Sequence, residues 1–345
     1  MEEIKSKLTE TFEPLQPAAN YLDRKLVVLR SWALQMDLFS VGYAAGTTTL
    51  LTYPLDLVKV RMQLQGELRP PGSYPIKYSS VPQSIMAIAR SPAGVKGLYR
   101  GIGQGMFFQG LSNAARVCVF DMCDRSGVTS DMDDQPALSR FIAASVLSGV
   151  VGSTLFSPLY LAKIQSQTQA SPDLAVGWQH SHPKPRWALW HAFRGHRGYL
   201  LSAWQGGSSA ALKITGTTMV HLFTYTTLQH VLYSVGLTDS LTNSCVAATL
   251  SAIPVVLLTN PLDLICTRMY NQKLGAYYTG IRHCAELTLA REGWRAFWKG
   301  CTANYLRTAP QMVVTLVMWD RMRRRGFEHQ MLEEQEVNDK TWDGA

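Results

Sequence analysis

Long stretches without charged residues alternate with polar segments along the whole chain. Residues 38–55, 141–162 and 241–262 contain no charged side chain, and residues 214–238 contain only two histidines that can titrate. Two further apolar stretches, residues 101–120 and 300–319, contain one arginine each, Arg116 and Arg307. Segments of about 17 to 25 such residues have the length of a membrane-spanning helix. The pattern predicts an all-α membrane protein with six spanning helices, and both arginines should face a water-filled interior because charge in lipid is costly.

The spanning segments belong to a threefold internal repeat. Pro54, Pro158 and Pro261 are separated by 104 and 103 residues, and each lies late in an apolar segment that continues as a polar one. A second shared feature follows about 40 to 50 residues later, an aromatic residue, a polar or basic residue and a glycine: Tyr99-Arg100-Gly101, Trp204-Gln205-Gly206 and Trp298-Lys299-Gly300. The chain is therefore divided into three two-helix repeats, 38–126, 127–237 and 238–326, with an N-terminal tail 1–37 and an acidic C-terminal tail 327–345.

These motifs resemble those of the mitochondrial carrier family, whose repeat reads P-x-[DE]-x-x-[KR]-x-[KR], followed after a gap by [DE]-G-x4-[WYF]-[KR]-G. The first repeat matches at Pro54, Asp56, Lys59 and Arg61, and the third matches through Glu292 to Gly300, with Cys266 in place of one base. The second repeat diverges most, with Tyr160 in place of the acid. The resemblance implies threefold pseudosymmetry, short amphipathic helices on the matrix side and a multi-pass protein of the mitochondrial inner membrane.

The resemblance also implies a gate on the matrix side of the cavity. In the family, the acid after each proline pairs with a base of the next repeat. Asp56 should therefore contact Lys163, Asp263 should contact Lys59, and the third position holds the uncharged residues Tyr160 and Cys266. Losing both members of one pair avoids leaving a single buried charge without a partner. Glutamines that follow the prolines should brace the two pairs, and Tyr270 occupies the third brace position; the matrix gate predicted in this way consists of Asp56, Lys59, Gln63, Lys163, Gln167 and Asp263.

A second gate is expected at the opposite, cytoplasmic end of the even-numbered helices. The family pattern there is aromatic-[DE]-x-x-[KR], and only the last repeat keeps it, as Trp319, Asp320 and Arg323. Cyclic pairing would place two acids opposite each other, so this gate should be weak, or else neighbouring bases neutralise the acids locally. Its predicted members are Asp121, Asp124, Gln229, Asp320 and Arg323.

Substrate contacts are expected on the even-numbered helices, seven and eight residues after the shared glycines. Steps of four residues stay on one helix face and extend the set toward the cytoplasm. The predicted substrate-binding residues are Phe108, Gln109, Arg116, Lys213, Ile214, His221, Arg307 and Thr308. Three of them are cations and none is an acid. Cations that share one water-filled cavity repel each other unless an anion visits, which favours a small dianion as substrate.

Within the family, the segments RMQLQGEL, QGLSNAAR and RMYNQ are similar to those of the oxaloacetate-carrier subgroup. This similarity implies transport of oxaloacetate or related dicarboxylates by alternating access, as exchange or as symport with protons. Another anion such as sulfate, thiosulfate or a nucleotide is an alternative. A non-transporting receptor or scaffold with the same fold is a second alternative, of a different class.

Composition and charge agree with this interpretation. The formal net charge is +8, and the three loops between odd and even helices contain 14 basic against 4 acidic residues. That asymmetry is the positive-inside pattern and places these loops in the matrix. No basic face interleaved with aromatic residues indicates nucleic-acid binding. The six cysteines lack metal-ligand spacing, and no nucleophile or nucleotide motif indicates an enzyme, a metal or a cofactor. The expected partners are a small anionic metabolite and membrane lipid, with cardiolipin at the matrix-side helix ends, and we expect a monomer.

Overall fold

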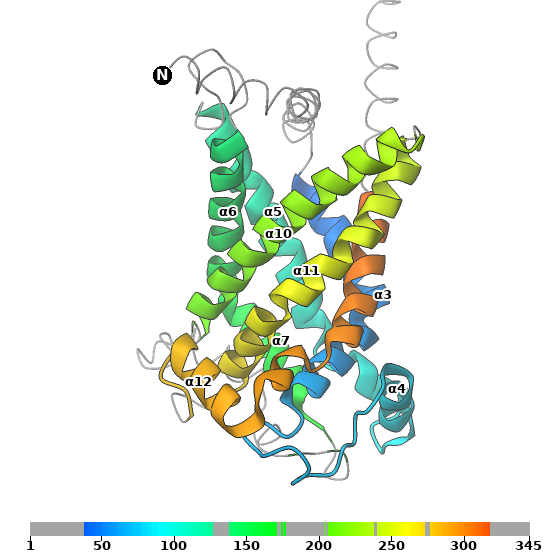
Figure 1. Cartoon of the computed structure of the whole chain (residues 1–345), viewed down its shortest axis with the longest axis vertical. Coiled ribbons are helices and arrows are strands. Elements are labelled where there is room, and N and C mark those ends of the chain that lie inside the picture. The colour runs from blue at the N-terminus through cyan, green and yellow to red at the C-terminus, as the bar shows by residue number, and fades with distance from the viewer. Residues whose placement is uncertain are drawn as a thin grey trace, which may run out of the picture.

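The computed structural model describes residues 38–126, 138–170, 174, 176, 204, 206–237, 240–272 and 277–317. Within these ranges every regular element is a helix, which confirms the predicted all-α fold (Figure 1). The long helices are α3 (Leu38–Leu64), α5 (Ile102–Arg125), α6 (Leu138–Leu155), α10 (Gly207–Ser234) and α11 (Ser240–Asn271), followed by a helix over residues 301–317. Shorter elements are α4 (Val81–Arg90), α7 (Ser157–Thr168) and α12 (Ile281–Glu292), with the 3-10 turns η2 (Val95–Tyr99) and η4 (Trp294–Trp298).

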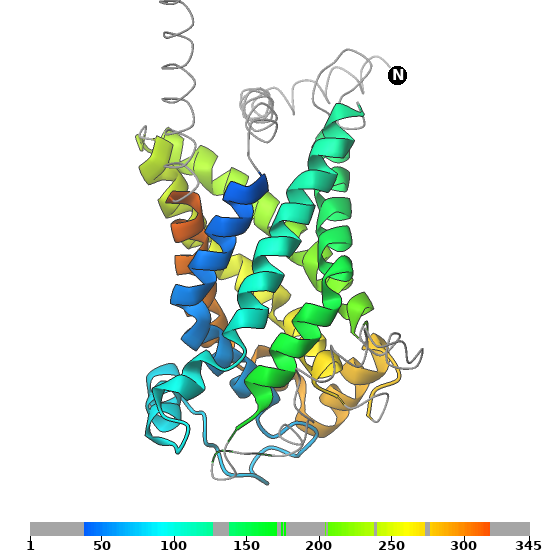
Figure 2. The ribbon, with the colours of Figure 1, turned by 180° about the vertical axis from the view of Figure 1, so that it is seen from behind.

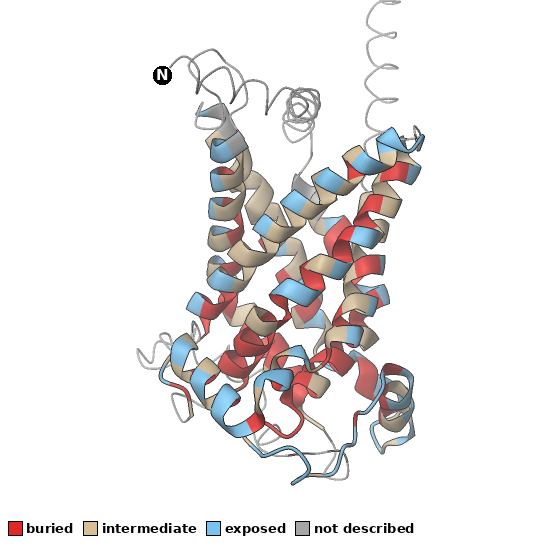
Figure 3. Ribbon diagram, viewed as in Figure 1, coloured by how far each residue is buried: buried red, intermediate tan, exposed pale blue. Residues whose placement is uncertain are grey.

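The long helices form a bundle in which neighbours in sequence are neighbours in space. The helix α3 packs on α5, α5 on α6, α6 on α10, and α10 on α11. The views from both sides show the helices diverging at one end and converging at the other, where α4 and α12 lie (Figures 1 and 2). Buried residues gather at this narrow end (Figure 3). The short helices α4 and α12 occupy the loops for which the repeat pattern predicts matrix-side helices.

The three proline positions do not have the same backbone. Pro54 and Pro261 lie inside the continuous helices α3 and α11. The second repeat is broken instead, because α6 ends at Leu155, Phe156 is non-helical, and α7 continues at an angle of 64°. Pro158 then lies at the start of α7, where a missing backbone N–H costs no hydrogen bond.

Glycines allow the closest helix contacts. A Cβ atom on Gly42 would lie 3.2 Å from the carbonyl oxygen of Gly110, and a Cβ atom on Gly110 would lie 3.1 Å from that of Gly42. On α6, Gly149 faces Ile214, and Gly152 faces the backbone and side chain of α5. These are the small-residue contacts that permit backbones to approach in lipid.

By length and hydropathy alone, residues 241–271 could cross a membrane, and the bent pair α6 and α7 qualifies if it is counted as one span. Other long helices of the described chain contain charged residues, among them Lys59, Arg116 and Arg307. These side chains border an internal cavity rather than the outer surface of the bundle. A bundle that surrounds water can therefore contain spanning helices that a hydropathy threshold misses.

Candidate functional site

A cavity of about 600 Å³ lies between the long helices. Its lining includes residues from α3, α5, α7, α10, α11 and the 301–317 helix, so all three repeats contribute to it. The structure brings all eight predicted substrate-binding residues to this one cavity: Phe108, Gln109, Arg116, Lys213, Ile214, His221, Arg307 and Thr308. The positions counted from the shared glycines therefore face one cavity, and their contact with substrate stays a prediction.

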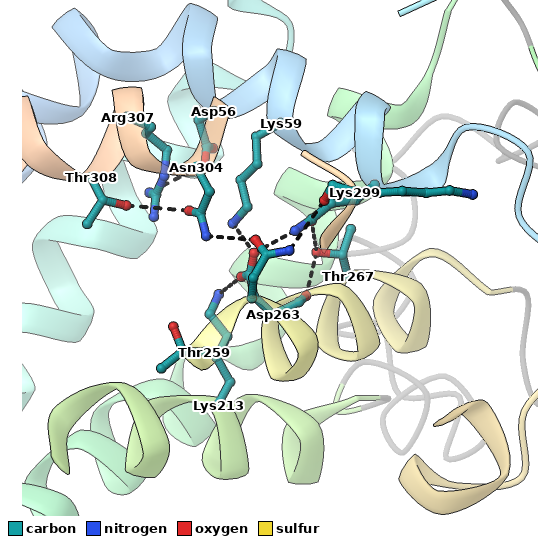
Figure 4. A network of polar contacts seen from close by, with 12 residues as sticks. Asp56, Lys59, Lys213, Thr259, Asp263, Thr267, Lys299, Asn304, Arg307 and Thr308 are labelled. Atoms are coloured by element: carbon teal, nitrogen blue, oxygen red, sulfur yellow. Dashed lines mark hydrogen bonds and ion pairs between the residues drawn. The ribbon is translucent and has the colours of Figure 1, made fainter. Parts of the chain in front are cut away.

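At the narrow end, the cavity closes over a cluster of buried charges, which we call the floor cluster. Its members are Asp56, Lys59, Lys163, Lys213, Asp263 and Arg307. All of them except Lys163 are labelled in Figure 4. Four of them, from α3, α7 and α11, are at most 5% exposed. A buried charge is stable only with partners in good geometry, and each carboxylate in the floor cluster has two cations and one amide.

Asp56 joins the first repeat to the other two. Its Oδ2 atom lies 2.7 Å from Nζ of Lys163 and accepts a hydrogen bond of 2.8 Å from Nε2 of Gln167. Nη1 of Arg307 lies 3.4 Å from the other carboxylate oxygen. The contact with Lys163 is the one that the repeat pattern predicts, and Gln167 occupies its predicted brace position.

Asp263 is surrounded in the same way. It forms an ion pair with Lys59, and its Oδ1 atom lies 2.7 Å from Nζ of Lys213. Gln63 donates a hydrogen bond of 2.8 Å to Oδ2 of Asp263, and Thr267 donates one of 2.9 Å to the Gln63 amide oxygen. The structure thus brings together the predicted pair of Asp263 with Lys59 and its glutamine brace.

The third position of the threefold pattern contains no ion pair. Tyr160 and Cys266 belong to one buried cluster with Tyr270. The Tyr270 hydroxyl lies 2.7 Å from Oγ of Ser157, a contact that joins the third repeat to the second. An aromatic cluster therefore fills the place where a third acid and base would meet.

Sequence reasoning missed the contacts of Lys213 and Arg307 with the two carboxylates. The sequence pattern assigns both cations to the substrate alone, because each belongs to an even-numbered helix and the gate acids belong to odd-numbered ones. A contact with the gate acids could have been expected, because the substrate-contact positions and the acids both lie toward the narrow end of the cavity. Their meeting depends on the tilt of the helices, which the repeat does not specify.

The upper part of the cavity holds Arg116 and His221. A Cβ atom on Gly152 would lie 2.7 Å from Cγ of Arg116, so the stem of this arginine lies against α6. The His221 ring lies 5.6 Å from the Tyr225 ring, and its Nε2 atom is buried with no hydrogen-bond partner among the described residues. These groups add a cation and a titratable ring above the floor cluster.

A second charged network joins the first and third repeats below the cavity. Fully buried Arg268 donates two hydrogen bonds, of 2.6 and 2.9 Å, to the carboxylate of Glu292, and Lys299 lies 2.5 Å from the same group. Burial would raise the pKa of Glu292, but the hydrogen bonds and charges of Arg268 and Lys299 lower it instead. Glu292 also accepts a hydrogen bond from the backbone of Leu68. This network therefore ties the third repeat to the first at the narrow end of the bundle.

The predicted cytoplasmic gate falls mostly outside the described part of the chain. This applies to Asp320 and Arg323, and to the side chain of Asp124. The Gln229 amide donates hydrogen bonds of 2.8 Å to the Tyr225 hydroxyl and 2.9 Å to Oγ of Ser244. The Asp121 side chain is half-buried on α5. The pairing across this gate stays a prediction.

Comparison with known proteins identifies the family to which the chain belongs. The family model for mitochondrial carrier proteins matches residues 33–130, 134–236 and 238–330. The chain therefore belongs to the mitochondrial carrier family, whose members are transporters rather than enzymes and multi-pass proteins of the mitochondrial inner membrane.

Individual relatives cover most of the chain. Solute carrier family 25 member 35 of Homo sapiens is 32% identical over 295 residues, 84% of this chain and 97% of that protein. The mitochondrial citrate transporter E of Aspergillus niger is 31% identical over 283 residues, covering 80% and 88%. The mitochondrial oxaloacetate transport protein of Saccharomyces cerevisiae is 30% identical over 289 residues, covering 81% and 86%. The similarity thus extends over all three repeats.

Proposed function

We propose that this carrier moves small dianionic metabolites, with dicarboxylates such as oxaloacetate as the first candidates, by alternating access. The observation that carries the proposal is the charge of the floor cluster. Four cations there face two carboxylates, which leaves two positive charges at the narrow end of the cavity. Arg116 adds a third cation above them. A dianion balances the floor cluster, and guanidinium and ammonium groups form charge-assisted hydrogen bonds with carboxylates.

The names of two relatives support the same class of substrate, because one is a citrate and the other an oxaloacetate transport protein. A nucleotide is a weaker candidate, since Phe108 is largely buried in the aromatic cluster with Tyr160 and offers little stacking surface. An amino-acid substrate would need a free acceptor for its ammonium group, and both floor carboxylates already contact two cations each.

The described conformation supports a carrier closed at its narrow end. The floor cluster and its glutamine braces tie all three repeats together there, whereas the helices diverge at the other end (Figure 1). We assign the narrow end to the matrix, because the loops between odd and even helices are basic and two of them carry α4 and α12, which lie at that end (Figure 1). Substrate would then enter the cavity from the cytoplasmic side.

Uptake of labelled dicarboxylates into liposomes that contain the purified protein tests this function. We expect saturable uptake of a dicarboxylate and little uptake of a neutral amino acid or a nucleotide. Sulfate and thiosulfate, assayed in parallel, distinguish dicarboxylates from inorganic dianions. If no anion enters above the level of empty liposomes, the non-transporting receptor or scaffold becomes the better interpretation.

We also infer that an anionic lipid such as cardiolipin binds at the matrix-side start of α5. A surface pocket of about 730 Å³ there is lined by Tyr99, Arg100, Gly101 and residues of α7, and the N-terminus of α5 opens into it. A helix N-terminus and an arginine attract phosphate. Native mass spectrometry of the purified protein with and without added cardiolipin measures the binding and also tests the expected monomer.

A further inference from the structure

The floor cluster lacks one of the three links that its symmetry allows, and Tyr160 occupies that position. Its side chain is 8% exposed and lies in an aromatic row, with ring centroids 4.8 Å from Phe108 and 4.8 Å from Tyr270. The row runs from the cavity lining on α5 to the end of α11. The ring is therefore held on both sides and cannot turn away from the cluster without disturbing this packing.

Two lysines from different ion pairs meet at this ring. Nζ of Lys163 and Nζ of Lys213 each lie 5.4 Å from the ring centroid of Tyr160. The electron-rich face of an aromatic ring attracts a cation at this distance. Lys163 belongs to the ion pair with Asp56, and Lys213 belongs to the ion pair with Asp263. Tyr160 therefore lies between the two halves of the floor cluster.

The hydroxyl group adds a directional contact with only one of the two lysines. Nζ of Lys213 donates a hydrogen bond of 3.2 Å to the Tyr160 hydroxyl while it also contacts Asp263 at 2.7 Å. Lys213 is therefore held by two contacts: Tyr160 on α7 of the second repeat and Asp263 on α11 of the third repeat. In the sequence pattern, that connection would come from an acid at position 160 and a base at position 266.

We propose that Tyr160 and Lys213 together form the third link of the floor cluster, and that this link releases when an anion binds. Lys213 also borders the cavity, so an anion that approaches it competes with the Tyr160 hydroxyl and with Asp263. This second part rests on the proposed function, because it requires that the cavity takes an anion. Tyr160 acts as a positioning residue that holds Lys213.

A thermal unfolding cycle tests the link without any substrate. In the purified full-length protein in detergent, Tyr160→Phe removes the hydroxyl and keeps the ring. We expect it to lower the unfolding midpoint by about 2 °C and to have no measurable effect in a Lys213→Met background. Tyr78→Phe is the control, because it also removes a buried tyrosine hydroxyl, one that donates to the backbone oxygen of Leu174 and lies away from Lys213. Its effect should be the same in both backgrounds, and an equal effect of Tyr160→Phe in both backgrounds would refute the link.

Transport kinetics test whether the link is sensitive to the anion. With the Tyr160 hydroxyl removed, a dianion no longer has to displace it from Lys213. We expect the KM for the transported dicarboxylate to fall about threefold, the scale of a weak hydrogen bond, without a rise in the maximal rate. A loss of general stability would not lower KM. An unchanged or higher KM contradicts the anion sensitivity. Absence of any anion transport by the wild type would contradict both this sensitivity and the proposed function, while the unfolding cycle would still decide the link.

Discussion

Arg307 and Lys213 border the cavity, and each also contacts a carboxylate of the floor cluster. Side chains with two such roles couple the occupancy of the cavity to the closure beneath it. Substrate binding accelerates transport most when the contacts are strongest in the high-energy state between the two open conformations. Under the proposed function, a cation that exchanges its protein carboxylate for a substrate carboxylate as the floor cluster opens would provide such contacts.

Removing either cation should therefore affect transport strongly. We expect Arg307→Ala and Lys213→Ala each to lose a charge-assisted contact of about 1.5 to 3 kcal/mol, and uptake of dicarboxylate by liposomes should fall well over tenfold. Arg282→Ala is the control, because Arg282 is 92% exposed on α12 and its pair with Glu286 contributes little. Near-normal uptake by both cavity variants would contradict their assignment as substrate contacts.

The pairing of Asp56 with Lys163 gives a second test at this scale. Asp56→Asn should impair transport and stability because it leaves Lys163, which is 4% exposed, without its carboxylate. Lys163→Gln in the same chain should restore part of the loss, since the unpaired charge is then absent. The rescue should be incomplete because Arg307 also contacts Asp56. Unfolding midpoints and uptake of the two single variants and the double variant measure the coupling, and purely additive effects would argue against the pair.

The floor cluster also shows which contacts can be predicted from the sequence and which cannot. The pairs of Asp56 with Lys163 and of Lys59 with Asp263 could be predicted because the family resemblance supplies the pairing rule and the repeat fixes which positions are equivalent. The role of Tyr160 could not, because a missing acid shows only that an ion pair is absent. The contacts that replace it depend on the packing of three helices, and no single repeat encodes them.

At the scale of helices, the second repeat differs from the other two. The sequence has a proline at the equivalent point of each repeat, but only in the second repeat are the flanking segments, α6 and α7, separate helices, with 64° between them. The break before Pro158 brings α7 under the cavity, where it presents both Tyr160 and Lys163 to the floor cluster. Proline positions predict where a helix changes direction, whereas the size of the bend depends on how neighbouring helices pack.

Close packing of α6 on α5 should also be necessary for the position of Arg116. A Cβ atom on Gly152 would lie 2.7 Å from the backbone oxygen of Ser112 and 2.7 Å from Cγ of Arg116. Because backbone cannot yield as a flexible side chain does, Gly152→Ala should separate the two helices and lower both the unfolding midpoint and uptake. Gly103→Ala is the control, since nothing lies within 4 Å of its added Cβ and alanine favours a helix. Equal midpoints for the two variants would show that this contact is not limiting.

For the whole molecule, two fields act on the proposed anionic substrate: the positive charge of the cavity attracts it, and the membrane potential opposes its release toward the matrix. The cavity lining contains cations at both levels, so it raises the local concentration of anions. Moving a dianion toward a negative matrix is opposed by about 2.3 kcal/mol per charge per 100 mV. A proton that crosses with the anion would remove part of this cost. Two sites are candidates for it, the buried ring of His221 in the cavity and the pair Asp124 and Asp320, whose side chains lie outside the described part of the chain.

Uptake against an imposed pH gradient decides whether a proton crosses and which site carries it. With the membrane potential clamped at zero, a liposome lumen more alkaline than the medium should accelerate dicarboxylate uptake, because the proton flows down its gradient with the anion. Two like charges a few Å apart favour sharing one proton. If the acid pair carries it, Asp124→Lys should form an ion pair with Asp320 and flatten the dependence, whereas His221→Asn should not. Loss of the dependence in His221→Asn alone would place the proton in the cavity, whose lining also includes Arg116. An uptake rate that is the same with and without the gradient would exclude proton coupling.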